Sequence, residues 1–128
     1  APLYARVVES LAPMMARLKG ESGWSGLMLV TGATGPGEAR QLRDLAPSAL
    51  FLVPGYGAQG AGAADAVAGF APAPDGGRRL EGGCVNASRS VTFPEGSATA
   101  KSIEAWQSVI AAAIDAAQSD LTQAVSLA

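Results

Sequence analysis

An α/β fold with a parallel β-sheet is the class of structure that the sequence predicts, on the basis of three observations. Short apolar runs recur along the 128 residues, in GLMLVTGAT, ALFLVPGYGAQG and GGCVNASRS. Small or polar residues end each run, and a segment with helical periodicity follows. Continuous apolar strands that alternate with amphipathic helices are typical of parallel β/α units whose sheet is covered by helices. We therefore expect about three such units after an initial helix.

Two helices are predicted in the first half of the chain. Residues 1–18 form the first, because apolar residues recur there at helical spacing, namely Val7, Leu11, Met14 and Leu18. Because the chain opens in the body of this helix, we expect it to start partway through a fold. Residues 35–48 form the second helix: Pro36 suits its first turn, Glu38 suits the positive end of the helix dipole, and Pro47 lies beyond its end.

Two further helices are predicted in the second half. Residues 63–70 give a short one with Asp65 near its start, where the dipole favours a carboxylate. Residues 102–125 give a long one with an apolar face formed by Ile103, Trp106, Ile110, Ile114, Ala117, Leu121 and Val125. Between these helices, residues 71–83 have the composition of an exposed connection, and the strand of Cys84 follows.

Composition excludes several classes of function. The net charge is −2 and the nine basic residues are scattered, so the chain has no basic patch for nucleic acid or an anionic membrane. No tract is long and apolar enough to span a bilayer. A single cysteine, Cys84, fits a reducing compartment such as the cytoplasm, and we expect its side chain to be small, buried and structural. The absence of histidine excludes a zinc site and a Ser-His-Asp triad within this chain.

Three loops should meet at the carboxyl ends of the strands, where parallel α/β folds bind ligands. They are residues 31–34, 54–62 and 86–90. Arg89, among small residues with free amides, suits a phosphate, and the Gln59 amide can donate to an anion or accept from a base. Taken singly, Arg89 fits a solvated turn equally well, Gln59 fits an ordinary surface position, and the glycines around Gln59 fit a loose loop.

No residue in these loops forms a catalytic group unaided, so we assign no catalytic residue to the chain. The rim carries no paired carboxylates, and neither lysine is well placed. A complete (β/α)₈ barrel has about 250 residues, so three units and a helix are somewhat under half of one. The sequence therefore indicates the binding side of a site whose reactive side lies elsewhere.

The stretch TGATGPGEARQLRDLAPSALFLVPGYGAQGAGAADA, with CVNASRS after it, resembles the C-terminal part of orotidine 5'-phosphate decarboxylase. The likeness is to the branch with the longer VPGYGAQG and VNASRS signatures. It implies a TIM barrel that converts orotidine monophosphate into uridine monophosphate and CO₂ in pyrimidine biosynthesis, with no metal or organic cofactor. Residues 1–128 would then be the C-terminal part of one barrel domain, carrying about the sixth to eighth strands, and the N-terminal part would be absent from this chain.

The resemblance also implies site residues. Pro54 would lie against the base, Gln59 would bridge the phosphate and the pyrimidine, and Ser88 and Arg89 would bind the phosphate. The loop that closes over the nucleotide would include Gly55, Tyr56, Gly57, Ala58 and Gly60. The family's Asp-Lys-x-x-Asp network has no counterpart here, so the chain alone should be inactive. The complete enzyme would be a cytoplasmic homodimer.

Two other functions remain open on the residues. The chain could be a stand-alone α/β module that binds a phosphorylated ligand without catalysis, which the intact mass and any copurifying N-terminal partner would reveal. It could instead belong to another phosphate-binding barrel, for example one that acts on a sugar phosphate. Titration with uridine monophosphate and other nucleotides would separate that barrel from the decarboxylase.

Overall fold

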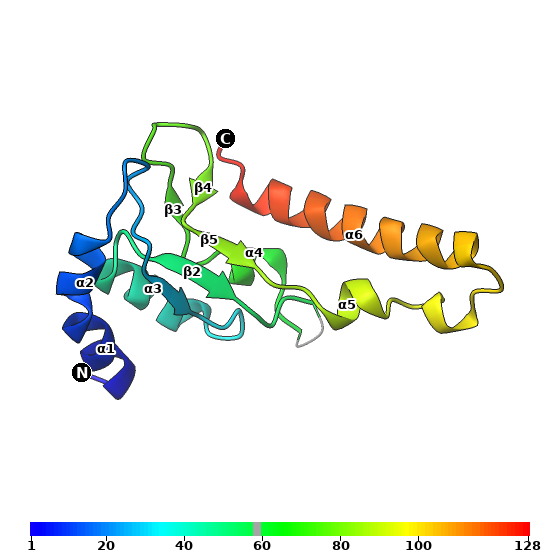
Figure 1. The fold of residues 1–128 in the computed structure, drawn as a ribbon, viewed down its shortest axis with the longest axis horizontal. Coiled ribbons are helices and arrows are strands. Elements are labelled where there is room, and N and C mark those ends of the chain that lie inside the picture. The colour runs from blue at the N-terminus through cyan, green and yellow to red at the C-terminus, as the bar shows by residue number, and fades with distance from the viewer. Residues whose placement is uncertain (58–59) are drawn as a thin grey trace.

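The computed structural model describes residues 1–57 and 60–128 as a parallel sheet with helices packed on one of its faces (Figure 1). In this part of the chain the sheet has the order β1–β2–β5, where β1 is Met28–Val30, β2 is Leu50–Val53 and β5 is Gly83–Val85. Both pairings are parallel, with Leu29 beside Phe51 and Leu52 beside Cys84. The three predicted strands and the α/β class are confirmed.

The predicted helices occur in the predicted order, although the one expected at residues 63–70 ends at residue 66, and two short helical turns at residues 89–92 and 97–99 were not predicted. The helices are α1 (Leu3–Ser10), α2 (Ala12–Arg17), α3 (Pro36–Leu45), α4 (Ala63–Ala66), α5 (Arg89–Thr92) and α6 (Ile103–Val125), with a 3₁₀ turn η1 (Ser97–Thr99) before α6. Pro36 is the first residue of α3, where its missing N–H costs nothing. Ser102 caps α6, because its Oγ accepts a hydrogen bond of 3.1 Å from the amide of Ala105.

The N-terminal segment differs from the single helix that its periodicity predicts. The helix breaks at Leu11, because Pro13 has no N–H and its ring obstructs the carbonyl one turn earlier. The side chains that face the core are also shifted by one position. Ala5, Val8 and Met15 are buried, whereas Val7, Met14 and Leu18 of the predicted apolar face are exposed.

The two faces of the sheet have different surroundings. On the helix-covered face, Phe51 and Val53 are 0% and 3% exposed and belong to the hydrophobic core. Side chains alternate between faces along a strand, so Val30, Leu52 and Cys84, which are register partners, lie on the opposite face. Val30 is 69% exposed there. The prediction of a buried Cys84 was wrong for this structure, because no helix packs on that face of β5 in the described chain and the thiol is exposed.

A two-stranded antiparallel hairpin lies where the sequence predicts only a connection. Its strands are β3 (Ala71–Pro72) and β4 (Leu80–Glu81). The hairpin also holds the end of the chain, since the amide of Leu127 donates to the carbonyl of Arg78 at 3.1 Å. Figure 1 shows this end of α6 returning to the hairpin, at the amino ends of the strands.

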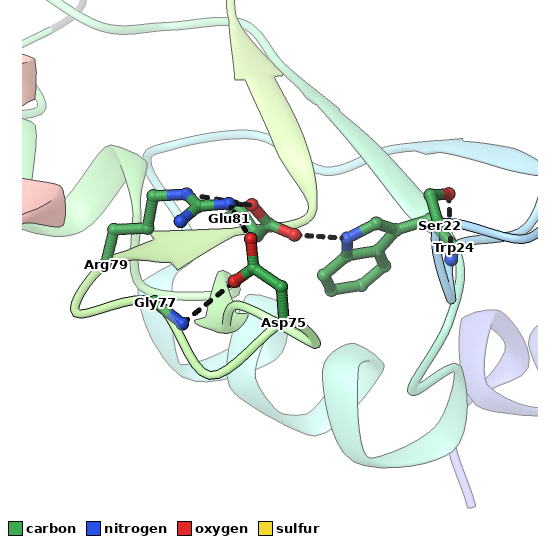
Figure 2. A network of polar contacts seen from close by, with 6 residues as sticks. All are labelled: Ser22, Trp24, Asp75, Gly77, Arg79 and Glu81. Atoms are coloured by element: carbon green, nitrogen blue, oxygen red, sulfur yellow. Dashed lines mark hydrogen bonds and ion pairs between the residues drawn. The ribbon is translucent and has the colours of Figure 1, made fainter.

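A polar network fixes the same edge of the sheet (Figure 2). Glu81 accepts from the Trp24 indole at 2.7 Å through one oxygen and from Arg79 Nε at 3.1 Å through the other. Arg79 also pairs with Asp75 at 2.9 Å, and the Asp75 carboxylate accepts from the Gly77 amide at 2.8 Å. The network ties the hairpin to the segment before β1.

Arg43 is a buried cation that the sequence analysis did not single out. Its guanidinium donates to backbone carbonyls in the segments that join α3 to β2, α4 to β3 and β4 to β5. The acceptors are Ala46 at 3.1 Å, Pro47 at 3.3 Å, Ala49 at 2.7 Å, Gly69 at 2.7 Å and Gly82 at 3.0 Å. It also lies 3.9 Å from the centroid of the Phe51 ring. Desolvation lowers the pKa of Arg43 to about 10, so the group keeps its charge at neutral pH.

The long helix α6 is only partly covered. Among its described residues none is buried, and Ile103 and Trp106 of the predicted apolar face are 71% and 44% exposed. The apolar face of α6 is therefore packed only in part. The first turns of the helix extend beyond the sheet (Figure 1), whereas Leu121, in the second half of the helix, packs against the core. No helix in the described ranges is both long and apolar enough to cross a membrane.

Candidate functional site

The three predicted loops do meet at the carboxyl edge of the sheet. Backbone hydrogen bonds continue the strand pairing into them: Thr31 donates to Leu52 at 2.9 Å, and Asn86 donates to Val53 at 2.9 Å. Just beyond, Ala33 of the first loop donates to the carbonyl of Pro54 at 2.8 Å. Pro54 is thereby held at the start of the second loop, between the other two.

The second loop is folded back on itself at a narrow point that we call the neck, formed by Tyr56, Gly57 and Ala61. The amide of Gly57 donates to the carbonyl of Ala61 at 3.0 Å, and Tyr56 and Ala61 form a parallel bridge. Gly55, Gly57 and Gly60 have φ angles of 99°, 76° and 86°, which explains the glycines, because side chains disfavour this left-handed region. Ala58 and Gln59 lie outside the described residues, so the role of Gln59 stays a prediction.

The third loop carries the predicted phosphate ligands. Ser88 precedes the short helix α5, and its carbonyl accepts from the amides of Val91 and Thr92 at 3.1 and 2.8 Å. Arg89 is the first residue of α5 and its side chain is exposed. None of the described residues accepts a hydrogen bond from its guanidinium. Arg89 is thus a solvent-facing cation on the rim next to Ser88.

A cavity of about 500 Å³ separates the neck and α5 from α6. Across it, the Tyr56 hydroxyl donates to Asp120 Oδ2 at 2.8 Å. Desolvation first, and then the hydrogen bond and charge of Asp120, raise the pKa of Tyr56 to about 12, so the phenol keeps its proton at neutral pH. Sequence reasoning included Tyr56 in the loop but not Asp120, because no local pattern connects residues 64 positions apart.

Two buried hydroxyls at this edge lack a partner among the described residues. Thr31 Oγ1 lies beside the first turn of α3, in a cavity of about 190 Å³, and Ser90 Oγ lines the larger cavity next to the neck. The edge thus offers hydroxyls, backbone amides and one exposed guanidinium, which suit an anionic, hydrogen-bonding ligand. Within the same described ranges, no three His, Cys, Asp or Glu side chains are grouped so that they could hold a metal ion.

Comparisons with known proteins identify the relatives of this chain. No protein-family model matches it. The orotidine 5'-phosphate decarboxylase of Halorubrum lacusprofundi is 42% identical over 93 residues, which are 72% of this chain and 30% of that protein. That of Deinococcus radiodurans is 40% identical over 95 residues, 70% of this chain and 33% of the relative. The chain is a relative of the orotidine 5'-phosphate decarboxylases.

The match falls on the C-terminal part of these decarboxylases, and the chain spans about a third of their length. A solved structure agrees: the chain resembles Leishmania donovani UMP synthase with a TM-score of 0.50 and 32% identity, over 85% of this chain and 22% of that one. The resemblance seen in PGYGAQG and VNASRS is therefore confirmed, and the fold of this chain is similar to part of the UMP synthase structure.

Proposed function

We propose that this chain is the phosphate-binding part of an orotidine 5'-phosphate decarboxylase, a lyase that converts orotidine monophosphate into uridine monophosphate and CO₂. The observation that carries the proposal is the identity of 36–42% with decarboxylases from several organisms over about 70% of the chain. In the complete enzyme, residues 1–128 would be the C-terminal part of one barrel domain, and their parallel strands its sixth, seventh and eighth.

The exposed face of the sheet supports a partial barrel. Met28 and Val30, on the edge strand β1, are 47% and 69% exposed, and the nearby Cys84 thiol is exposed too. Apolar side chains on an uncovered sheet face are unfavourable in water, whereas the inward-facing residues of a small barrel fill its interior. We infer that further strands of the same domain cover this face.

The residues of the rim would then have defined roles. Arg89 and the backbone at Ser88 would bind the phosphate, Pro54 would lie against the base, and Gln59 would join the phosphate to the pyrimidine side. The loop from Gly55 to Gly60 would close over the nucleotide. A guanidinium suits a phosphate dianion because its fork donates to two oxygens at once.

These groups would act by binding rather than by proton transfer. The phosphate is remote from the carbon that loses CO₂, so contacts to it contribute by holding the ring in place and keeping water out. The acid–base residues would come from the N-terminal part of the barrel. We further propose that the complete enzyme works as a homodimer in the cytoplasm and needs no cofactor.

The test is a complete polypeptide in which this chain follows the N-terminal part of the Deinococcus radiodurans relative. We expect it to release CO₂ from orotidine monophosphate and to bind uridine monophosphate, and Arg89→Ala to weaken both. Arg78→Ala is the matched control, since Arg78 is also exposed but lies on the hairpin at the opposite edge. A chimera that unfolds cooperatively yet neither binds the nucleotide nor releases CO₂ would overturn the proposal. Tighter binding of a sugar phosphate would favour another barrel enzyme.

A further inference from the structure

The neck of the second loop is held from two sides. On its own side, the Gly57–Ala61 hydrogen bond of 3.0 Å closes it, and Ala61, 7% exposed, anchors it in the core. On the other side, the hydroxyl of Tyr56 reaches Asp120 of α6 at 2.8 Å. The first contact fixes the shape of the neck, and the second fixes where the neck lies relative to α6.

The neck also contacts the helix that carries Arg89. A Cβ placed on Gly57 would lie 3.4 Å from Ser90 Oγ, so the side chain of Ser90 packs against the backbone of the neck. Ser90 directly follows Arg89 in α5. The position of the neck therefore determines how the second loop lies against the turn that presents the guanidinium.

We propose that Tyr56 is a positioning residue of the candidate site, which through its hydrogen bond to Asp120 holds the neck in the place where the second and third loops can share one ligand. The contact is direct: the ring of Tyr56 packs against the core, and its hydroxyl donates to Asp120 of α6 at the surface. Tyr56 need not touch the nucleotide for this role, since it acts through the neck.

The inference rests on the proposed function for its kinetic test, which uses the complete polypeptide. Tyr56→Phe removes the donor and Asp120→Ala removes the acceptor. Each should raise KM for orotidine monophosphate about two- to tenfold, the range of one net hydrogen bond, with kcat changed much less. The reason is that a misplaced neck weakens phosphate binding in the ground state and the transition state alike.

Three further variants make the test specific. The double variant Tyr56→Phe, Asp120→Ala should be no worse than either single one, because both remove the same bond. Asp120→Asn retains an oxygen that accepts from the phenol, so KM should return close to that of the wild type. Asp115→Ala, an exposed carboxylate on the same helix, is the control and should leave KM unchanged.

A second measurement does not depend on activity. Amide hydrogen exchange at Gly57, whose N–H is bonded to Ala61, should be faster in Tyr56→Phe, whereas exchange at Asn86 should stay the same. An unchanged KM together with unchanged exchange at Gly57 would overturn the inference. A folded wild-type polypeptide without decarboxylase activity would overturn the proposed function instead, and the exchange rate at Gly57 would then decide the inference alone.

Discussion

Replacing Arg43 by methionine should destabilise the fold by about 4 kcal/mol. The substitution keeps a long apolar stem but removes every hydrogen bond of the guanidinium. Among the described residues, Arg43 is the hydrogen-bond donor to the buried carbonyls of Gly69 and Ala49, both at 2.7 Å. Each buried carbonyl left without a donor costs about 1–3 kcal/mol, and loss of the cation–π contact with Phe51 adds about 1 kcal/mol.

The opposing term is the desolvation of the cation, which is also what lowers the pKa of Arg43. Apolar replacements of buried charges are neutral or stabilising in some proteins, because they remove this cost. We expect the carbonyls to dominate, since they remain buried and cannot be substituted together with the arginine. Arg43→Lys keeps the charge and at most three donors, so a loss of about 2 kcal/mol is expected.

Urea unfolding of the complete polypeptide, followed by circular dichroism and by tryptophan fluorescence, measures these differences. Trp24 is a local probe, because the Arg43 guanidinium lies 5.1 Å from its ring centroid. Arg40→Met, on an exposed face of α3, is the matched control and should change the free energy of unfolding by less than about 0.5 kcal/mol. An Arg43→Met protein as stable as the control would refute the reasoning. If it fails to fold, Arg43→Lys still gives a measurable value.

Three other predictions concern the site and the exposed face. Arg89→Ala in the complete enzyme should lower kcat/KM by the equivalent of about 3–4 kcal/mol, and Gln59→Ala should lower it less. A near-normal kcat/KM for Arg89→Ala in steady-state kinetics would contradict the assignment of Arg89 to the phosphate. Cys84 should react with a maleimide readily in the separate chain, where it is exposed, and slowly in the complete polypeptide; equal rates would mean that no further strands cover this face. Tyr56, with its pKa raised to about 12, should keep its proton above pH 10 in the folded state, so the contribution of its hydrogen bond to stability is fully present below pH 10 and is lost between about pH 10 and 12. A spectroscopic titration in which Tyr56 ionises near pH 10 would contradict this prediction.

The main elements of the fold were predictable from sequence because their signals are local. The apolar runs around Leu29, Phe51 and Cys84 mark strands, and Pro36 marks the start of α3. The hairpin of β3 and β4 was missed, since two residues per strand are too few to show alternation. The prediction of a single N-terminal helix was wrong, because it relied on apolar periodicity and did not consider that Pro13 interrupts a helix.

The candidate site was predictable in part for the same reason. Parallel strands bring their following loops to one edge, so the loops of Pro54 and Arg89 could be placed at the same edge of the sheet before any coordinates. The hydrogen-bond partners of Arg43 and Tyr56 could not be predicted, because only tertiary packing brings them close. They are backbone carbonyls for Arg43 and the carboxylate of Asp120 for Tyr56. The exposure of Cys84 was equally hidden, since it depends on what packs against the second face of the sheet, which no local pattern shows.

The attachment of the C-terminal residues to the hairpin has a practical consequence. Ser126 forms an antiparallel β-bridge with Arg79, so residues 126–128 lie beside the amino ends of the strands. An affinity tag or surface linker added there would emerge across the sheet from the loops of Pro54 and Arg89. Immobilisation through this end should leave those loops facing the solution, whereas coupling the separate chain through Cys84 would anchor it by its uncovered sheet face.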